Sequence, residues 1–353
     1  MSNIVSLRHP ARGSCDDAIP GLVDLFSRRR RGRHDPFWLK ENAELLQILA
    51  AIGASVDLEP LEALAKGLPE ELRFFPQYYR MYLSLALDLR DLGMVDVPVS
   101  EMAAFVHEQD LPAIELSDTH RGEAHLLLQR GGGAAGDTSH EVRLLHFARR
   151  SSAFCLPNRR AAYDLTHLVF HAANYGRRSL PCDPARRLSL MHVGIVAWLE
   201  SNLDLLSEVT LALRFSGESV PASWDERVAQ AVDQVAFREA HPGDSFDDDY
   251  HQFLVLNWAH GVAGHTPFQT PLPARARIVR YGPKRNTALH ELSLALLDMG
   301  QARRPEWRAM RWRLWPKLSE PTRHCLECVE VLPEFDGFFA GFSRAAPFVG
   351  GRI

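Results

Sequence analysis

The chain has 353 residues, of which 46% are hydrophobic and 24% are charged, a composition that fits one large globular domain or two smaller ones. Its 40 Lys and Arg residues against 44 Asp and Glu residues give a net charge of -4, which excludes a general basic surface for nucleic acid or an anionic membrane. The N-terminus has no apolar segment of signal-peptide length, and no uninterrupted apolar stretch of about 18 residues occurs. With five scattered cysteines, these features predict a cytoplasmic protein without a membrane partner.

An arginine-rich segment comes before the first clear helical pattern. It reads SRRRRGRH over residues 27–34 and includes Arg28, Arg29, Arg30, Arg31 and Arg33. Runs of like charge are usually solvated, so residues 1–35 are expected to form a flexible basic arm. The other interpretation is a contact with a phosphate, a nucleic acid or a partner protein.

Helical periodicity dominates from residue 37 onward, and no segment has a convincing strand pattern. Asp35 and Pro36 are suited to begin the first long helix, and a break is expected near Ser201, where two apolar segments join. The expected helices span residues 37–54, 76–93, 100–108, 119–130, 140–154, 160–175, 183–200, 201–217, 223–241, 247–261, 286–300, 304–317 and 320–331.

Glycines that end these helices recur at regular intervals. Gly93, Gly176, Gly217 and Gly300 are separated by 83, 41 and 83 residues, which indicates a unit of about 41 residues with two further ends near 134 and 258. A unit of this length predicts helical hairpins, none of which buries its apolar face alone. We therefore expect an all-α protein with one hairpin domain over residues 36–335 and a tail over 336–353. The hairpins are expected to close into an α/α toroid, and the alternative is an open α-solenoid.

Titratable residues recur in the same register. Positions about nine residues before each observed or expected helix end carry a His or a carboxylate in five of six cases, and in a toroid these positions could face one central cavity. The residues at or beside these positions are Ser84, His125, His167, Glu208, His251 and Glu291.

A second spacing repeats together with this register. Asp164-x-x-His167 and Asp248-x-x-His251 have the same form and lie 84 residues apart. Residues three apart share a helix face, so each pair can present a carboxylate and an imidazole to one ligand. Such pairs bind Fe, Mn or Zn in helical cores, usually with further carboxylates.

The candidates for these further carboxylates are Asp204, Glu208 and Glu291, and His171 is expected to orient its neighbours. A competing interpretation is purely structural. Asp164 and Asp248 fall in first helical turns, where an acid is favoured by the helix dipole, and His167 could be a hydrogen-bonded core histidine.

Three short motifs in these segments resemble an uncharacterised group of bacterial all-helical proteins. The likeness covers residues 160–261 and consists of a Thr-His-x-x-Phe signature, an acid-rich helix that follows it, and a Tyr-His pair. The matching residues are Thr166, His167, Phe170, Asp204, Glu208, Tyr250 and His251. No activity accompanies this resemblance, which supports the positions as a set.

The functional hypothesis is a metal-dependent enzyme that acts on a small molecule or peptide in a central cavity. Asp164, His167, Glu208 and His251 are expected to bind the metal (Fe, Mn or Zn) or to act as acid and base, with Asp248 and Glu291 as further metal ligands. The alternative is a helical-repeat scaffold for protein interactions without catalytic activity. No phosphate-binding loop, nucleophile elbow or H-E-x-x-H motif occurs.

Overall fold

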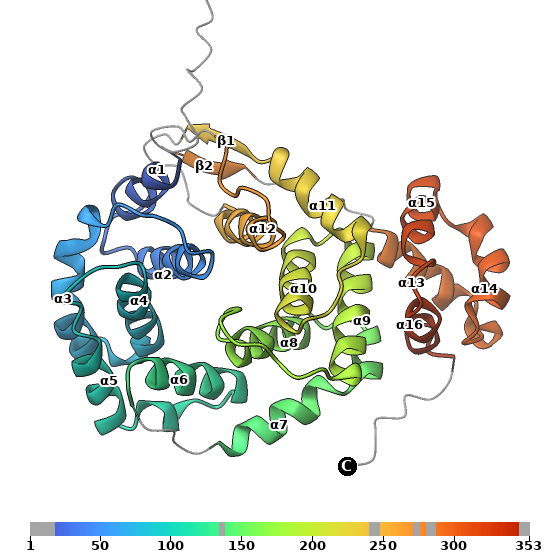
Figure 1. The fold of residues 1–353 in the computed structure, drawn as a ribbon. Helices are drawn as coiled ribbons and strands as arrows, with labels where there is room; N and C mark the ends of the chain where they lie inside the picture. The colour runs from blue at the N-terminus through green and yellow to red at the C-terminus, as the bar shows by residue number, and fades with distance from the viewer. Residues whose placement is uncertain (1–17, 134–137, 240–247, 271–275, 280–286, 346–353) are drawn as a thin grey trace, which may run out of the picture.

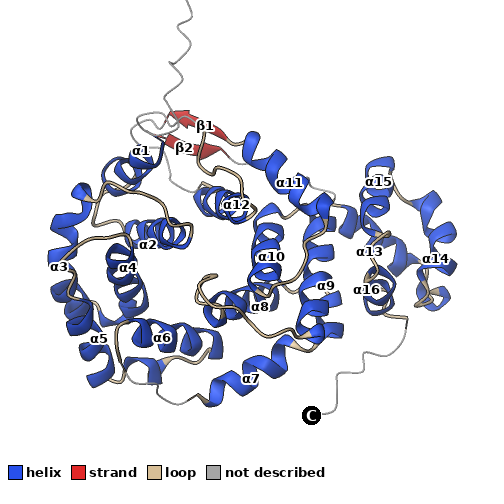
Figure 2. Ribbon diagram, viewed as in Figure 1, coloured by secondary structure: helices blue, strands red, loops and turns tan. Residues whose placement is uncertain are grey.

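The computed structural model describes residues 18–133, 138–239, 248–270, 276–279 and 287–345. Within these residues the chain forms sixteen α-helices and one pair of short strands, which confirms the expected all-α class (Figure 2). None of the described helices is long and apolar enough to cross a membrane.

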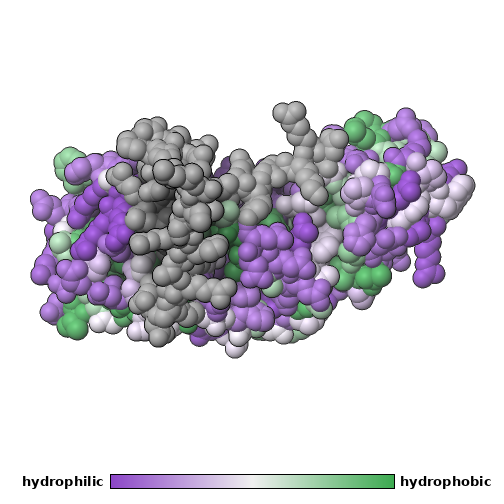
Figure 3. All heavy atoms as spheres, turned by 90° about the horizontal axis from the view of Figure 1, so that it is seen from above, coloured by the Kyte–Doolittle hydropathy of each residue, from purple (hydrophilic) through white to green (hydrophobic). Residues whose placement is uncertain are grey.

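Alternate helices of the chain lie toward the centre of the molecule (Figure 1). Each of these inner helices contacts the next one, and the last, α12, also packs against the first, α2. Viewed from its edge, the molecule is much wider than it is thick, and hydrophilic residues cover most of the coloured surface (Figure 3). The inner helices are α2 (Pro36–Ala51), α4 (Tyr79–Asp91), α6 (Asp118–Arg130), α8 (Arg159–Ala172), α10 (Leu203–Phe215) and α12 (Tyr250–Val262).

The helices between them lie on the outside and cover the inner layer (Figure 1). The core between the two layers is apolar and includes Trp224, Leu190 and Leu211, all fully buried. The outer helices are α1 (Ala18–Asp24), α3 (Glu62–Phe74), α5 (Val99–Glu108), α7 (Ser139–Ala148), α9 (Pro184–Glu200) and α11 (Ala222–Asp233).

Local sequence explains where the inner helices begin and end. Side chains of Asp35, Ser117, Asn158 and Asn202 accept a hydrogen bond from a backbone amide in the first turn of α2, α6, α8 and α10, which satisfies a donor that the helix leaves unpaired. Each inner helix is followed by a glycine with positive φ, a conformation that other residues adopt at a cost. These glycines are Gly53, Gly93, Gly132, Gly176, Gly217 and Gly264.

One expectation about local structure is met, two helix limits are corrected, and two short strands occur where none was expected. The break near Ser201 is confirmed, since Ser201 ends α9 with φ 54° and α10 begins at Leu203. The expected helix over 140–154 is instead α7 followed by the short 3-10 helix η6 (Ser151–Cys155). The expected helix over 223–241 ends at Asp233 and is followed by strand β1 (Ala236–Glu239). This strand pairs antiparallel with β2 (Ala276–Val279), so both strands depend on a partner distant in sequence.

The last four helices lie outside the inner layer, beside α9 (Figure 1). Residues 336–353 were expected to be a tail, but 336–342 belong to α16, whose four phenylalanines are buried. Phe338 stacks on Phe342, and Trp307 meets Phe335 and Phe339 edge to face, an apolar cluster that holds this segment in place. These helices are α13 (Ala288–Asp298), α14 (Trp307–Leu314), α15 (Glu320–Val329) and α16 (Phe335–Phe342).

The described part of the arginine-rich segment is also structured, contrary to the expected arm. Residues 18–29 form α1 and the π-helix η2 (Leu25–Arg29), with Leu25 and Phe26 buried. The Arg30 side chain is fully buried and forms ion pairs with Glu41 at 3.0 Å and Asp248 at 2.9 Å. A guanidinium held between two carboxylates is ordered by its hydrogen bonds, so this arginine is a structural residue.

Candidate functional site

The inner helices surround a cavity of about 280 Å³. Every inner helix contributes to its wall, which carries an unusual density of titratable groups for the centre of a protein. These groups are Lys40 and Glu44 from α2, Arg80 from α4, His120 and Glu123 from α6, Asp164, His167 and His171 from α8, Tyr175 after α8, Glu208 from α10 and His251 from α12.

His251 and Asp204 form the first imidazole–carboxylate pair at this site. Nδ1 of His251 lies 2.9 Å from Oδ1 of Asp204, and the hydroxyl of Tyr163 donates to the other carboxylate oxygen at 2.7 Å. Burial alone would lower the pKa of His251, but the hydrogen bond and the charge of Asp204 raise this pKa to about 10. Burial alone would raise the pKa of Asp204, but the bonds from His251 and Tyr163 hold it below its ordinary value. At neutral pH the pair is therefore an imidazolium and a carboxylate.

Glu208 and His167 form the second pair. Glu208 lies one helical turn after Asp204 on α10, and its Oε1 is 3.5 Å from Nε2 of His167. Its other oxygen accepts a hydrogen bond from the hydroxyl of Thr166. Only 2% of the Glu208 side chain is exposed, whereas 45% of the His167 side chain is exposed and faces the cavity. Burial lowers the pKa of His167, but the nearby Glu208 carboxylate raises this pKa by more than burial lowers it, so the net change is upward.

Asp204, Glu208 and His251 each offer a ligand atom, and these atoms all lie within 4.8 Å of one another. Ligand atoms around a bound Zn²⁺ or a similar ion are separated by roughly 3 to 3.5 Å, so rotations that move these side chains by about 1 to 2 Å would complete the geometry. Two carboxylates and one imidazole form a donor set that suits Fe, Mn or Zn. The chemistry of these residues therefore fits a divalent metal.

The rest of the cavity wall combines a charged and an aromatic region. Arg80 donates to Glu115 at 2.9 Å and also to Glu123, so its charge is balanced within the protein. Burial lowers the pKa of His171 to about 4 even though the nearby Glu123 acts in the opposite direction, and His171 is neutral at physiological pH. Trp258 packs against Phe170, Tyr175 and Phe215, with ring centroids 5.1, 6.2 and 5.7 Å apart.

The structure brings four of the six predicted metal or catalytic residues to this cavity. Asp164, His167, Glu208 and His251 all lie on its wall. Asp164 stands apart from the group of close ligand atoms, in which the second carboxylate is Asp204.

Asp248 does not lie in the cavity, which corrects its assignment as a metal ligand. Both of its carboxylate oxygens accept hydrogen bonds from Arg30 at 2.9 Å, and one also accepts from the backbone amide of Ile278 at 3.1 Å. Asp248 and His251 have the same spacing as Asp164 and His167. This shared spacing does not bring the two aspartates to the same site. Asp248 precedes α12, so its side chain leaves the chain in a different direction from that of a residue inside a helix.

Glu291 is likewise placed elsewhere. It lies on α13, outside the inner layer, where its carboxylate accepts from the backbone amide and the hydroxyl of Ser319 at 3.0 and 2.9 Å. These bonds cap the start of α15, and they lower the pKa of Glu291 against the opposing effect of burial. Its role is structural because α13 belongs to the C-terminal helices and not to the wall of the cavity.

Two cavity residues, Glu44 and Glu123, are not among the residues predicted from the sequence. Both nevertheless occupy the predicted register of nine residues before a helix end. Each lies nine residues before a helix-ending glycine, since 53 - 9 = 44 and 132 - 9 = 123. Gly53 lies inside the expected helix over 37–54, so no helix end is expected there. The register that the sequence predicts therefore begins one hairpin too late, at α4 to α13 in place of α2 to α12.

The chain is similar to one protein family, and the geometry of its site is the evidence for what the site does. No curated protein and no solved structure matches it. A family model described as "Domain of unknown function (DUF6902)" matches residues 1–345, nearly the whole chain. The chain belongs to this family, DUF6902, and its cavity is the candidate functional site of a family member.

Proposed function

We propose that the protein is a closed α/α toroid whose central cavity is the active site of a metal-dependent enzyme. The alternation of inner and outer helices supports a toroid, and so does the contact between α2 and α12, because the two ends of an open solenoid do not meet. The single observation that carries the proposed metal chemistry is the convergence of Asp204, Glu208 and His251 at this cavity.

Each residue of the site has a distinct proposed role. Asp204, Glu208 and His251 would hold the metal, which would activate a water molecule or polarise a carbonyl group. His251 must lose a proton before it binds, so protons and metal compete for it. His167 faces the cavity beside Glu208 and is placed to accept or donate a proton.

The size and lining of the cavity favour a small polar substrate over a peptide. Pockets for small molecules usually span about 300 to 1,000 Å³, and 280 Å³ lies just below this range. The aromatic region around Trp258 offers an apolar surface, while the two imidazole–carboxylate pairs offer charge. These properties suit a compact molecule with a carbonyl, carboxylate or phosphate group.

Elemental mass spectrometry of the purified full chain tests this proposal. The wild type is expected to retain about one Fe, Mn or Zn ion per chain more than the Asp204→Asn/Glu208→Gln variant, because that variant loses two of the three ligands. Glu291→Gln is the matched control, since this carboxylate is hydrogen-bonded in α13 and should leave the metal content unchanged. Circular dichroism and thermal unfolding show whether each variant remains folded.

Equal metal content in the wild type and the folded double variant would contradict the metal centre. The alternative function is then a helical scaffold whose cavity residues contact a partner protein. The variant Asp164→Asn tests whether the metal ligand is Asp204 on α10 or Asp164 on α8. We expect it to keep its metal, because Asp164 is outside the group of close ligand atoms.

A further inference from the structure

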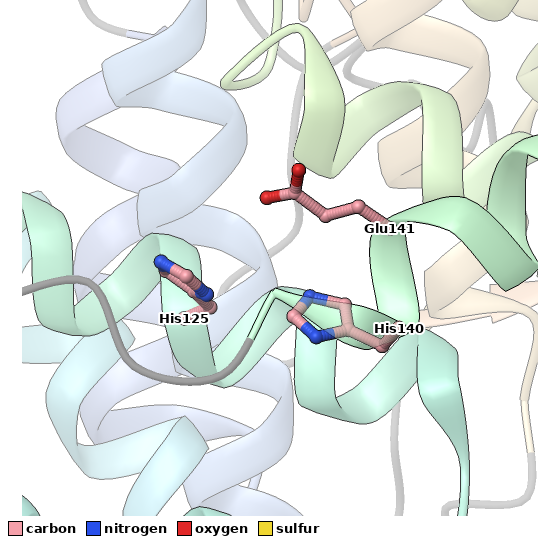
Figure 4. A group of neighbouring side chains, drawn as sticks. All are labelled: His125, His140 and Glu141. Atoms are coloured by element: carbon pink, nitrogen blue, oxygen red, sulfur yellow. The ribbon is translucent and has the colours of Figure 1, made fainter.

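A second group of metal-binding side chains lies between α6 and α7, apart from the central site. His125 comes from α6, and His140 and Glu141 come from the first turn of α7. Figure 4 shows the three side chains reaching toward one space between the two helices. One ligand atom from each lies within 4.8 Å of the other two.

The two helices are held together in a way that fixes these side chains. Arg143 of α7 forms a bidentate pair with Asp118 of α6, with both N–O distances at 2.7 Å. Gly122 of α6 lies beside the His140 ring, and a Cβ there would be in ordinary contact with it at 3.7 Å from Cδ2. The rings of His125 and His140 lie 5.6 Å apart between centroids.

The burial of these groups suits a metal ligand. His125 and His140 are only 9% and 4% exposed, whereas Glu141 is exposed and leaves a route for an ion. The side-chain amide of Gln129 lies 3.0 Å from Nε2 of His125. With its oxygen turned toward the ring, this amide accepts a hydrogen bond from Nε2–H and leaves the lone pair of Nδ1 for the metal.

We propose that His125, His140 and Glu141 form a second metal-binding site of the zinc type. Two imidazoles and one carboxylate are a donor set that Zn²⁺ uses when one coordination position remains open. The same residues line a cavity of about 580 Å³, which provides room for water or another ligand at that position. This site differs from the central one in its helices and in its excess of nitrogen ligands, and its cavity shares only His171 with the central cavity.

Cobalt titration of the metal-free full chain tests the second site independently of the central site. The Asp204→Asn/Glu208→Gln variant serves as the background, because it removes two proposed ligands of the central metal. We expect this background to bind about one Co²⁺ per chain, with the visible absorption of a four-coordinate ion, and Zn²⁺ to displace it.

Replacing a ligand should weaken this binding by more than about 100-fold, which is the upper range for losing only an outer partner of a ligand. His140→Ala and Glu141→Gln are both tested in this background, and the exposed Glu141 gives a variant that should fold even if the buried His140 does not tolerate change. His146→Ala is the matched control, since His146 is an exposed histidine on the same helix. Its affinity should equal that of the background.

The outcomes for the two sites are distinguishable. If the background binds no Co²⁺, or if Glu141→Gln and a folded His140→Ala bind as tightly as His146→Ala, the second site is refuted whatever the state of the central one. If the central proposal alone fails, the wild type and the background bind the same single ion, and Glu141→Gln still weakens it.

Discussion

Replacing Asp204 with asparagine should lower the pKa of His251 in the metal-free protein. The pKa of His251 is about 10, compared with an ordinary value of 6.5, and burial opposes this rise. The difference of 3.5 pH units corresponds to about 5 kcal/mol at about 1.36 kcal/mol per unit. Solvent screens part of the interaction between the pair, because 35% of the His251 side chain is exposed.

A second route gives a lower bound for the same effect. A hydrogen bond to a charged group contributes about 1.5 to 3 kcal/mol, which corresponds to roughly 1 to 2 pH units. We therefore expect the pKa of His251 to fall by at least about 1 to 2 pH units in Asp204→Asn. Burial, which lowers this pKa, and Glu44 and Glu208, which raise it, all remain in the variant.

Histidine-selective isotope labelling and an NMR titration measure this change. The chain has 16 histidines, so His251→Gln is needed to assign the signal. Asp164→Asn is the control, because Asp164 shares the cavity but makes no hydrogen bond or ion pair with any described residue. A pKa for His251 that is the same in the wild type and in Asp204→Asn would refute the assignment of this pair.

Three further variants test the fold around the site. Arg30→Met should lower the free energy of unfolding by about 3 to 5 kcal/mol in a urea titration, because it leaves the buried carboxylate of Asp248 without its cation and leaves Glu41 with Arg31 alone, and an unchanged midpoint would contradict the buried ion pairs. Gly194→Ala should lower the free energy of unfolding by about 1 to 3 kcal/mol, since a Cβ would overlap the buried ring of Trp224. Gly21→Ala is the control, because its Cβ meets open space and should leave the stability unchanged. Equal stabilities of the two variants would refute this packing. His171 has a pKa of about 4 in the folded chain against 6.5 otherwise, so the unfolded state alone gains a proton between these values. Stability should therefore fall as the pH drops from about 6.5 to 4, by up to about 3 kcal/mol, and this part of the loss should be missing in chemical denaturation of His171→Gln.

Helices and their ends could be predicted because their causes are local. The N-cap residue Asn202 and the glycine Gly217 act on backbone groups within a few residues of themselves, so the limits of α10 follow from its own sequence. The strands around Phe237 and Ile278 could not be predicted in this way. Each is four residues long and exists because it pairs with a segment about 40 positions away.

The candidate site was predictable as a set of residue types and only in part as a set of positions. The regular spacing predicts that His167 and Glu208 face the cavity, and both do. The same spacing also predicts Glu291, which lies elsewhere. Sequence intervals do not show where a row of hairpins begins. In the structure the contact between α12 and α2 decides this, and it brings Glu44 to the cavity while α13 stays outside.

The sequence by itself determined the all-α class, the spacing of about 41 residues between helix ends, and the titratable residues that follow this spacing. Only the tertiary structure decided that Asp204, and not Asp164 or Asp248, accompanies Glu208 and His251. The physical reason is that a carboxylate takes its role from its partners. Asp248 pairs with the buried charge of Arg30, whereas Asp204 is hydrogen-bonded to the imidazole of His251 and the phenol of Tyr163. All of these partners are distant in sequence, so local sequence does not predict them.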